Sequence, residues 1–303
     1  MRWLRYLGSQ LGVLFLWLIH FLPLSWISAM GAGLGALLYR FGRGRVTDIN
    51  LALCFPQMPE AERKALGLKH FKMLGRSALE LSKLVWGTDK DLLGMIHVVG
   101  LEHLQALKGK PVIALAPHFI GLNFGGIRAA YQWPGTASIY SRQKNPVLDR
   151  IFWRARTRFG NPVLVSRQEG LRAVIRTIRA GHSFYFLPDM DFGARDSIFV
   201  PFFGVETATI TGLSRLAAVA GAVVVPAVTR QLPGAGGYVL TFYPAWQDFP
   251  GRSVEEDTRR MNAFIEERVL EMPEQYFWAH KRFKTRPPGV PSPYERREAG
   301  GER

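Results

Sequence analysis

Beyond residue 100 the sequence alternates short apolar runs with amphipathic stretches of helical length, and this alternation restricts the possible folds more than any other feature. The apolar runs are residues 112–116, 137–140, 184–187, 223–228 and 239–243, and the helix candidates are residues 146–159, 168–180, 212–220 and 254–272. Continuously apolar strands that alternate with helices are typical of a parallel sheet covered on both faces. The sequence therefore predicts an α/β fold with a mainly parallel central sheet flanked by helices.

Two of these helix candidates begin with the pattern of a capping box. Ser166 precedes Glu169 by three residues, and Ser253 precedes Glu256 in the same way. In a capping box the serine side chain accepts a hydrogen bond from the backbone of the third residue, whose carboxylate returns one. Earlier in the chain, leucines at helical spacing over residues 60–86 predict a helix or a helix pair with one basic face.

The N-terminus contains a long uncharged stretch. No Asp, Glu, Lys or Arg occurs between Arg5 and Arg40, and a single membrane-spanning helix needs about 20 apolar residues. We expect a membrane anchor, either one tilted transmembrane helix or a shallow hairpin broken at Pro23. A cleaved signal peptide is disfavoured because the apolar stretch runs on past any plausible cleavage site.

These patterns predict four segments. Residues 1–45 form the membrane anchor and its basic flank, and residues 46–99 form a helical segment. Residues 100–285 form the α/β core, and residues 286–303 form a tail rich in proline, glycine and charge.

Composition restricts the partners. The chain has 39 Lys and Arg against 24 Asp and Glu, a net charge of +15, and 48% of its residues are hydrophobic. Such an excess suggests nucleic acid, an anionic membrane surface, a phosphorylated substrate or an acidic protein as partner. Together with the anchor, it favours lipid phosphate over nucleic acid. The single cysteine, Cys54, excludes an internal disulfide and zinc sites built on several cysteines.

Polar residues that directly follow the apolar runs are the first candidates for chemistry, because ligands bind at the carboxyl ends of parallel strands. His118 follows the first run and can act as a general base, and Asn123 is placed to reach back toward it. Asp189 and Asp191 follow the third run, and Arg142 and Arg195 lie in the loops nearby. No Walker loop, dinucleotide fingerprint, HExxH or Gly-x-Ser-x-Gly motif is present.

Several segments together resemble a known family. They are His118 with its five-residue spacing to Asn123, SRQKNPVLD at 141–149, LPDMDFGARDSIFVPFFG at 187–204, TGLSRLA at 211–217, VVVPAVTR at 223–230 and MPEQYFWAHKRFKTRP at 272–287. With these blocks the chain is similar, from the anchor to about Tyr294, to the late acyltransferases of lipid A biosynthesis. These lauroyl and myristoyl transferases belong to the wider glycerol-phosphate acyltransferase-like superfamily.

The resemblance implies a function and a location. It implies a bacterial inner-membrane enzyme whose catalytic domain faces the cytoplasm and which uses no metal or organic cofactor. The enzyme would move a fatty acyl group from acyl carrier protein to a hydroxyl of a phosphorylated, Kdo-bearing lipid A precursor. Its partners would be acyl carrier protein, the lipid A precursor and membrane phospholipid, with no nucleic acid.

The resemblance also implies roles for single residues. His118 would be the general base, and Arg142 falls in the block that binds the phosphorylated acceptor. Asp189 and Asp191 occupy the next block of the superfamily, with Arg195 close by as a further substrate-binding candidate.

One position departs from the family pattern. The family has His-x-x-x-x-Asp, or sometimes Glu, whereas the fifth position here is Asn123. Three explanations are open: a slow enzyme, a substitute carboxylate such as Asp189 or Asp191, or a non-catalytic lipid-binding membrane protein. Within the enzyme class, acylation of a lysophospholipid or an ornithine lipid is the alternative reaction.

Overall fold

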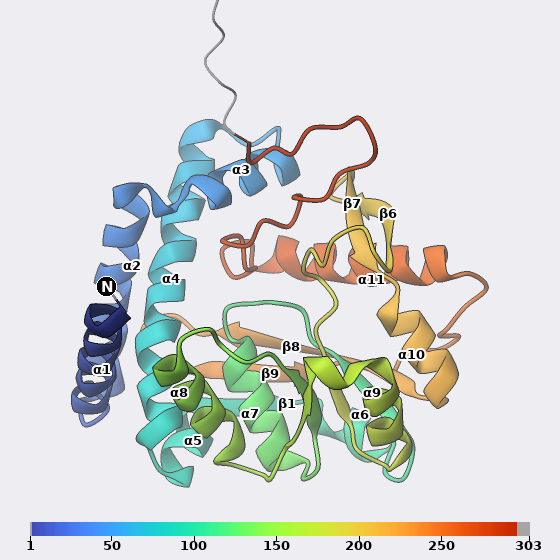
Figure 1. Cartoon of the computed structure of the whole chain (residues 1–303), viewed down its shortest axis with the longest axis horizontal. Coiled ribbons are helices and arrows are strands. Elements are labelled where there is room, and N and C mark those ends of the chain that lie inside the picture. Colours follow the sequence, from blue (N-terminus) through green and yellow to red (C-terminus); the bar gives the residue numbers. More distant parts are fainter. Residues whose placement is uncertain (1, 296–303) are drawn as a thin grey trace, which may run out of the picture.

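A seven-stranded sheet forms the centre of the computed structural model, which describes residues 2–295 (Figure 1). Its strand order is β1-β9-β8-β2-β5-β3-β4. The strands are β1 (Ile96–Val99), β2 (Val112–Leu115), β3 (Ala137–Tyr140), β4 (Val163–Ser166), β5 (Phe184–Phe186), β8 (Val223–Gln231) and β9 (Tyr238–Phe242). Only β8 and β9 pair antiparallel within this described sheet, and its other neighbours are parallel. The predicted α/β fold with a mainly parallel sheet is confirmed.

Helices surround this sheet and extend beyond it (Figure 1). They are α1 (Arg2–Ile19), α2 (Leu24–Leu38), α3 (Arg45–Cys54), α4 (Glu60–Trp86), α5 (Asp89–Met95), α6 (Leu101–Gln105), α7 (Leu122–Gln132), α8 (Pro146–Thr157), α9 (Gly170–Arg179), α10 (Gly212–Ala220) and α11 (Val254–Glu271). Residues 60–86 are thus one helix and not a pair. The capping box at Ser166 is present, although it opens a 3₁₀ turn before α9, and the Ser253 side chain accepts from the Glu256 N–H.

Strand residues alternate between two buried faces. In β2, Ile113 and Leu115 belong to the core cluster that includes α9, α10 and α11, whereas Val112 and Ala114 belong to the cluster that includes Ala129 of α7. Successive side chains of a strand point to opposite faces, so a strand with no polar residue must be covered on both. This is why the continuous apolar runs of the sequence become central strands.

The apolar segment 199–204 does not join this sheet. It forms most of β6 (Ser197–Phe202), which pairs antiparallel with β7 (Val205–Ile210) in a separate hairpin. Phe202 is fully buried, and the side chains of Arg259 and Asn262 on α11 both donate to the Pro201 carbonyl. This segment is therefore a core strand packed on α11.

The uncharged N-terminal stretch is divided in two. Pro23 separates the 18-residue α1 from the 15-residue α2, because proline has no N–H with which to continue the first helix. None of the helices within residues 2–295 combines the length and the hydropathy that crossing a membrane requires. The expected transmembrane helix is therefore not found in the described chain. Of the predicted tail, residues 296–303 lie outside the described residues.

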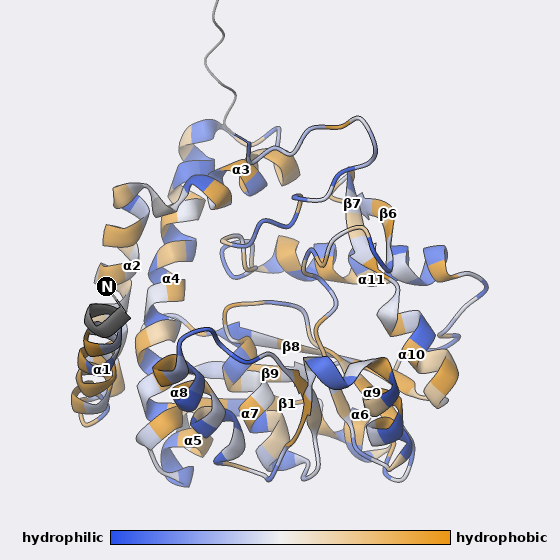
Figure 2. Cartoon of the chain, in the orientation of Figure 1, coloured by the Kyte–Doolittle hydropathy of each residue, from blue (hydrophilic) through white to orange (hydrophobic). Residues whose placement is uncertain are grey.

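Large apolar side chains are nevertheless exposed along both N-terminal helices. Figure 2 shows the largely hydrophobic colouring of α1. We call this the apolar hairpin surface; its residues are Tyr6, Leu7, Leu11, Leu14, Phe15, Trp17, Leu18, Phe21, Trp26, Met30, Leu34, Leu37 and Leu38. Groups of exposed large apolar side chains mark sites of interaction with proteins or membranes.

The other face of α2 packs closely on α4 (Figure 1). A Cβ atom on Gly35 would lie 1.9 Å from the Phe71 carbonyl oxygen, and one on Gly75 would lie 2.2 Å from the Gly31 carbonyl oxygen. Only glycine allows the two backbones to approach this closely. These glycines thus fix the apolar hairpin surface relative to the rest of the chain.

Candidate active site

The candidate site is at the carboxyl ends of two neighbouring parallel strands. His118 follows β2 and Asp189 follows β5, and the two strands are hydrogen-bonded to each other. One carboxylate oxygen of Asp189 lies 2.7 Å from His118 Nδ1, and the other accepts the His118 backbone N–H at 2.8 Å. Because a carboxylate accepts but cannot donate, Nδ1 carries the proton and Nε2 is left to act on a substrate.

The two side chains differ in exposure. The Asp189 side chain is 1% exposed, and the His118 side chain is 18% exposed. Burial by itself raises the pKa of a carboxyl group, but the charge and hydrogen bonds of His118, with the charge of Arg282, outweigh it, so the pKa of Asp189 lies below its usual value. The carboxylate is therefore ionised at neutral pH and can stabilise a proton on the imidazole.

The C-terminal block holds this arrangement in place. The Phe277 N–H donates to the His118 carbonyl at 2.8 Å, and the Ile120 N–H donates to the Gln275 carbonyl at 2.8 Å. The Tyr276 hydroxyl donates to the Asp189 carbonyl at 3.4 Å. Residues 272–287 thus contact both loops that carry the histidine and its carboxylate, although they are distant from them in sequence.

Asp191 has a different set of partners. Its carboxylate accepts the Thr285 N–H at 2.6 Å and the Thr285 hydroxyl at 2.9 Å, and its own N–H donates to His280 Nε2 at 3.1 Å. Burial and the charges of His118 and Arg282 lower the pKa of His280 to about 4, which keeps that ring neutral and able to accept. Asp191 therefore joins the loop after β5 to the C-terminal block.

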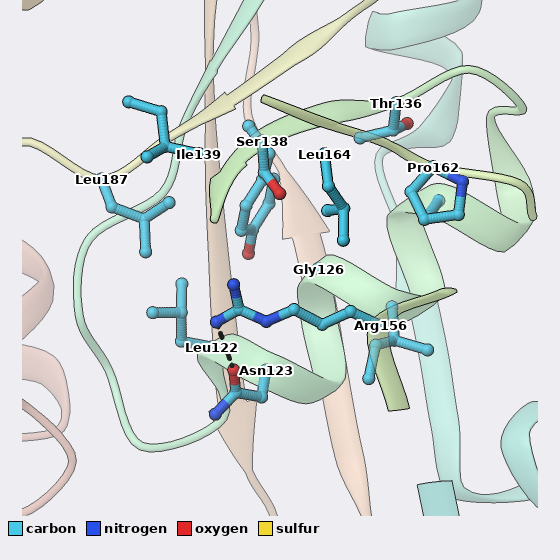
Figure 3. Close-up of a pocket in the computed structure, with 13 residues that line it drawn as sticks. Leu122, Asn123, Gly126, Thr136, Ser138, Ile139, Arg156, Pro162, Leu164 and Leu187 are labelled. Carbon is cyan, nitrogen blue, oxygen red and sulfur yellow. Dashed lines mark hydrogen bonds between the residues drawn. The ribbon is translucent and has the colours of Figure 1, made fainter. Parts of the chain in front are cut away.

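Asn123 lies in the first turn of α7, and its side chain is bonded away from His118. Its carbonyl oxygen accepts from Arg156 Nη2 at 3.4 Å (Figure 3). The position at which the family resemblance leads us to expect a carboxylate is thus beside an arginine, and the carboxylate that contacts the histidine comes from Asp189.

Arg156 and Asn123 border a largely apolar pocket (Figure 3). Its walls come from α7, β3, α8, the start of β4 and the residues after β5, and the apolar lining residues include Leu122, Ile139, Leu164 and Leu187. Burial lowers the pKa of Arg156 from its ordinary value. Arg156 does not stand out in the sequence, because four arginines occur between residues 150 and 158 and spacing alone does not show which of them points inward.

The two predicted substrate-binding arginines are exposed. The Arg142 side chain is 84% exposed, with Nε 4.0 Å from Asp149, and the Arg195 side chain is 96% exposed, with Nε 3.9 Å from Asp196. Arg142 directly follows β3, a strand of the parallel set, so it lies at the same edge of the sheet as His118, whereas Arg195 lies just before β6 of the separate hairpin. Their role in binding substrate stays a prediction.

No group of three or more His, Cys, Asp or Glu residues within the described chain is arranged to hold a metal ion. What the site does contain is a partly exposed imidazole with a buried carboxylate on one nitrogen and an apolar pocket nearby. An imidazole held in this way can remove a proton from a hydroxyl in a group-transfer reaction, and this role for His118 stays a prediction.

Comparison with known proteins identifies the family. A model of the bacterial lipid A biosynthesis acyltransferases matches residues 1–285. The chain is 36% identical over 295 residues to the lipid A biosynthesis lauroyltransferase of Escherichia coli (strain K12), covering 96% of this chain and 95% of the relative. It is 32% identical over 298 residues to the lipid A biosynthesis myristoyltransferase of the same strain, covering 97% and 92%. This chain belongs to the bacterial lipid A biosynthesis acyltransferase family, which confirms the resemblance drawn from its motifs.

Proposed function

We propose that this acyltransferase of lipid A biosynthesis moves a fatty acyl chain from acyl carrier protein to a hydroxyl of a Kdo-bearing lipid A precursor, with His118 as the general base. Family membership supports the pathway, and the donor and acceptor are expectations from the family resemblance. The pair formed by His118 and Asp189 is the observation that carries the chemistry.

The reaction follows from the two ring nitrogens of His118. Nε2 removes the proton of the acceptor hydroxyl while its oxygen attacks the carbonyl carbon of the acyl thioester. The carbon–sulfur bond of the tetrahedral intermediate then breaks, and the imidazolium returns the proton to the leaving thiolate. Asp189 holds Nδ1–H and stabilises the transient cation, and general base catalysis of this kind contributes about 100- to 10,000-fold.

The surroundings of the pair suit the rest of the substrate. We assign the start of the acyl chain to the pocket beside Arg156, because its lining is largely apolar and begins four residues after His118; its volume of about 70 Å³ is too small for a whole fatty acyl chain. In the first turn of α7, the Leu122 N–H donates to the Phe119 carbonyl and the Gly125 N–H donates to the Gly121 carbonyl, so the N–H groups of Asn123 and Phe124 are the candidates for stabilising the oxyanion. Arg142 follows β3, which is two strands from β2 and thus about 10 Å from it.

The apolar hairpin surface supports attachment to a membrane. Its exposed tryptophan and leucine side chains suit the boundary between headgroups and acyl chains. Attachment there to the inner membrane, with the catalytic domain on the cytoplasmic side, would place the enzyme where a lipid precursor and a soluble acyl carrier protein meet.

The test is acyl transfer by the purified full chain, with acyl carrier protein bearing a labelled acyl group as donor. The acceptors are a Kdo-bearing lipid A precursor, a lysophospholipid and an ornithine lipid precursor, followed by mass spectrometry. We expect the lipid A precursor to be acylated and His118→Ala to abolish the transfer. Acylation of another acceptor alone would change the assignment of the substrate, and no transfer to any acceptor would favour the non-catalytic lipid-binding protein.

A further inference from the structure

A second cavity, separate from the candidate active site, lies beside the helices α2 and α4. It has a volume of about 620 Å³ and lies between α2, α4, the turn from β8 to β9 and residues 271–275. This volume is in the range of small-molecule sites, about 300 to 1,000 Å³. The cavity shares no lining residue with the pocket beside Arg156 and includes neither His118 nor Asp189.

The charges around this cavity do not balance. Of the carboxylates that line it, Glu274 is 3.1 Å from Lys69, and Glu271 is 3.0 Å from Arg268. Lys72 and Arg230 also line the cavity, are exposed, and have no ion-pair partner in the part of the chain that the structure describes. Two positive charges are therefore available to a ligand, while both lining carboxylates are already paired.

The floor of the cavity is a buried polar network. Arg76 Nε lies 3.4 Å from the Glu80 carboxylate, which also accepts from the Ser28 hydroxyl at 2.6 Å. Arg76 Nη2 donates to the Leu232 carbonyl at 3.0 Å and so ties α4 to the turn after β8. These contacts join three of the four walls, so the cavity is formed before any ligand enters it.

One wall of the cavity borders the apolar hairpin surface. Ser25 and Ala29 of α2 are exposed and line the cavity. Each is followed directly in the chain by an exposed residue of the apolar hairpin surface, Trp26 and Met30 respectively. A ligand with its charged group between Lys72 and Arg230 could therefore keep an apolar tail beside α2. This combination of cations and apolar surface fits a lipid better than a free anion.

The opposite wall separates the cavity from the catalytic loop. Gln275 lines the cavity, whereas the next residue, Tyr276, packs against Phe119 and contacts Asp189. A phosphate held in the cavity is thus on the other side of this segment from His118, which argues against the reacting lipid A precursor as the occupant.

We propose that this cavity binds the anionic headgroup of a membrane phospholipid, with Lys72 and Arg230 contacting the phosphate. The inference builds on the membrane attachment in the proposed function but not on acyl transfer itself. The lipid would orient the enzyme on its membrane by a contact that is independent of the substrate.

The experiment measures binding of short-chain phosphatidylglycerol to the purified full chain by native mass spectrometry. Its variant combines Lys72→Gln with Arg230→Gln, and its control combines Arg172→Gln with Arg176→Gln, two exposed arginines of α9. Variant and control lose the same net charge. At about fivefold per phosphate contact, we expect the cavity variant to bind roughly 30-fold more weakly and the control to bind within about twofold of the unchanged protein.

Several outcomes would overturn the proposal. Phosphatidylcholine of the same chain length binding as well as phosphatidylglycerol would exclude recognition of the net negative charge. If inorganic phosphate bound to the chain and the cavity variant weakened this binding by the same factor, a lipid would be excluded. If both double variants weakened the binding of phosphatidylglycerol equally, the binding would depend on general surface charge. The cavity could instead bind the acceptor. In that case a lipid A precursor would bind tightly, only the cavity variant would weaken this binding, and phosphatidylglycerol would not bind.

The result can be separated from that of the acyl-transfer assay. If the unchanged chain transfers no acyl group but still binds phosphatidylglycerol through the cavity, the proposed function fails and this inference stands. Should the double variant fail to fold, a photoreactive phosphatidylglycerol cross-linked to the unchanged chain decides instead. Labelling of peptides from α2 and α4 supports the site, and labelling confined to other helices contradicts it.

Discussion

Asp189→Asn is expected to reduce the turnover of acyl transfer far more than any change at Asn123. In the structure one Asp189 oxygen accepts the His118 backbone N–H and the other accepts Nδ1–H. The backbone donor cannot be changed, so the amide oxygen of the new asparagine would remain on it and the NH₂ group would face Nδ1. Nδ1 would then have to accept, the proton would move to Nε2, and the ring could no longer act as a base from that nitrogen.

The magnitude follows from this wrong tautomer. In the serine-protease triad, the same change of the orienting aspartate lowers turnover by about ten-thousandfold. That factor equals about 5.5 kcal/mol of transition-state stabilisation. Because the histidine here is held by the same kind of contact, we expect a loss of about 1,000- to 10,000-fold in kcat, with little change in the binding of substrates.

The assay is the initial rate of acyl transfer under saturating substrate, with circular dichroism to confirm folding. Asp196→Asn is the matched control, because it makes the same substitution in the same loop at a side chain that is 74% exposed. We expect the control to keep its full rate. If Asp189→Asn stayed within tenfold of the unchanged enzyme while His118→Ala was inactive, the assignment of Asp189 as the partner of the base would be refuted.

Three further changes test other parts of the structure. Asn123→Asp is expected to alter the rate of acyl transfer by less than about tenfold, because His118 already has a carboxylate partner and the new carboxylate would pair with Arg156. A gain of 1,000-fold in the same assay would contradict this. Gly35→Ala is expected to lower the free energy of unfolding by about 1–3 kcal/mol in denaturant titration, because the new Cβ atom would clash with α4. Gly33→Ala is the control and is expected to cost nothing, because a Cβ atom at Gly33 meets no other atom within 4 Å. Burial lowers the pKa of His70 to about 4, so between pH 6.5 and 4 the unfolded chain holds a proton on this ring that the folded chain lacks. His70 by itself then lowers stability by about 1.4 kcal/mol per pH unit as the pH decreases. His70→Gln is expected to reduce the measured slope of stability against pH by that amount, and an unchanged slope would contradict it.

Local sequence patterns located five of the seven strands of the central sheet and missed β1, β4 and the helix α7. The predicted ranges 137–140 and 212–220 coincide with β3 and α10, and residues 112–116 extend only one residue beyond β2. Runs without polar residues imply coverage on both faces whatever their neighbours are, so the layered α/β arrangement could be inferred without coordinates. The β6–β7 hairpin could not, because composition does not distinguish a strand of the main sheet from one packed on α11.

The N-terminus shows the limit of composition. The absence of charge from residue 6 to residue 39 predicted an anchor, and Pro23 left both a tilted helix and a broken hairpin open. Only the packing of Gly35 against the backbone of α4 shows which face of α2 is buried and which belongs to the apolar hairpin surface.

The candidate base and its possible partners were determined by the sequence alone, because residues that follow apolar strands are brought to one edge of a parallel sheet. The sequence left three explanations open for Asn123, and two carboxylates, Asp189 and Asp191, could each have replaced the missing one. Both carboxylates follow β5, the neighbour of β2, and only the tertiary structure shows that Asp189 contacts His118 whereas Asp191 contacts Thr285. Strand order and side-chain direction depend on contacts between residues far apart in the chain, and no local pattern records them.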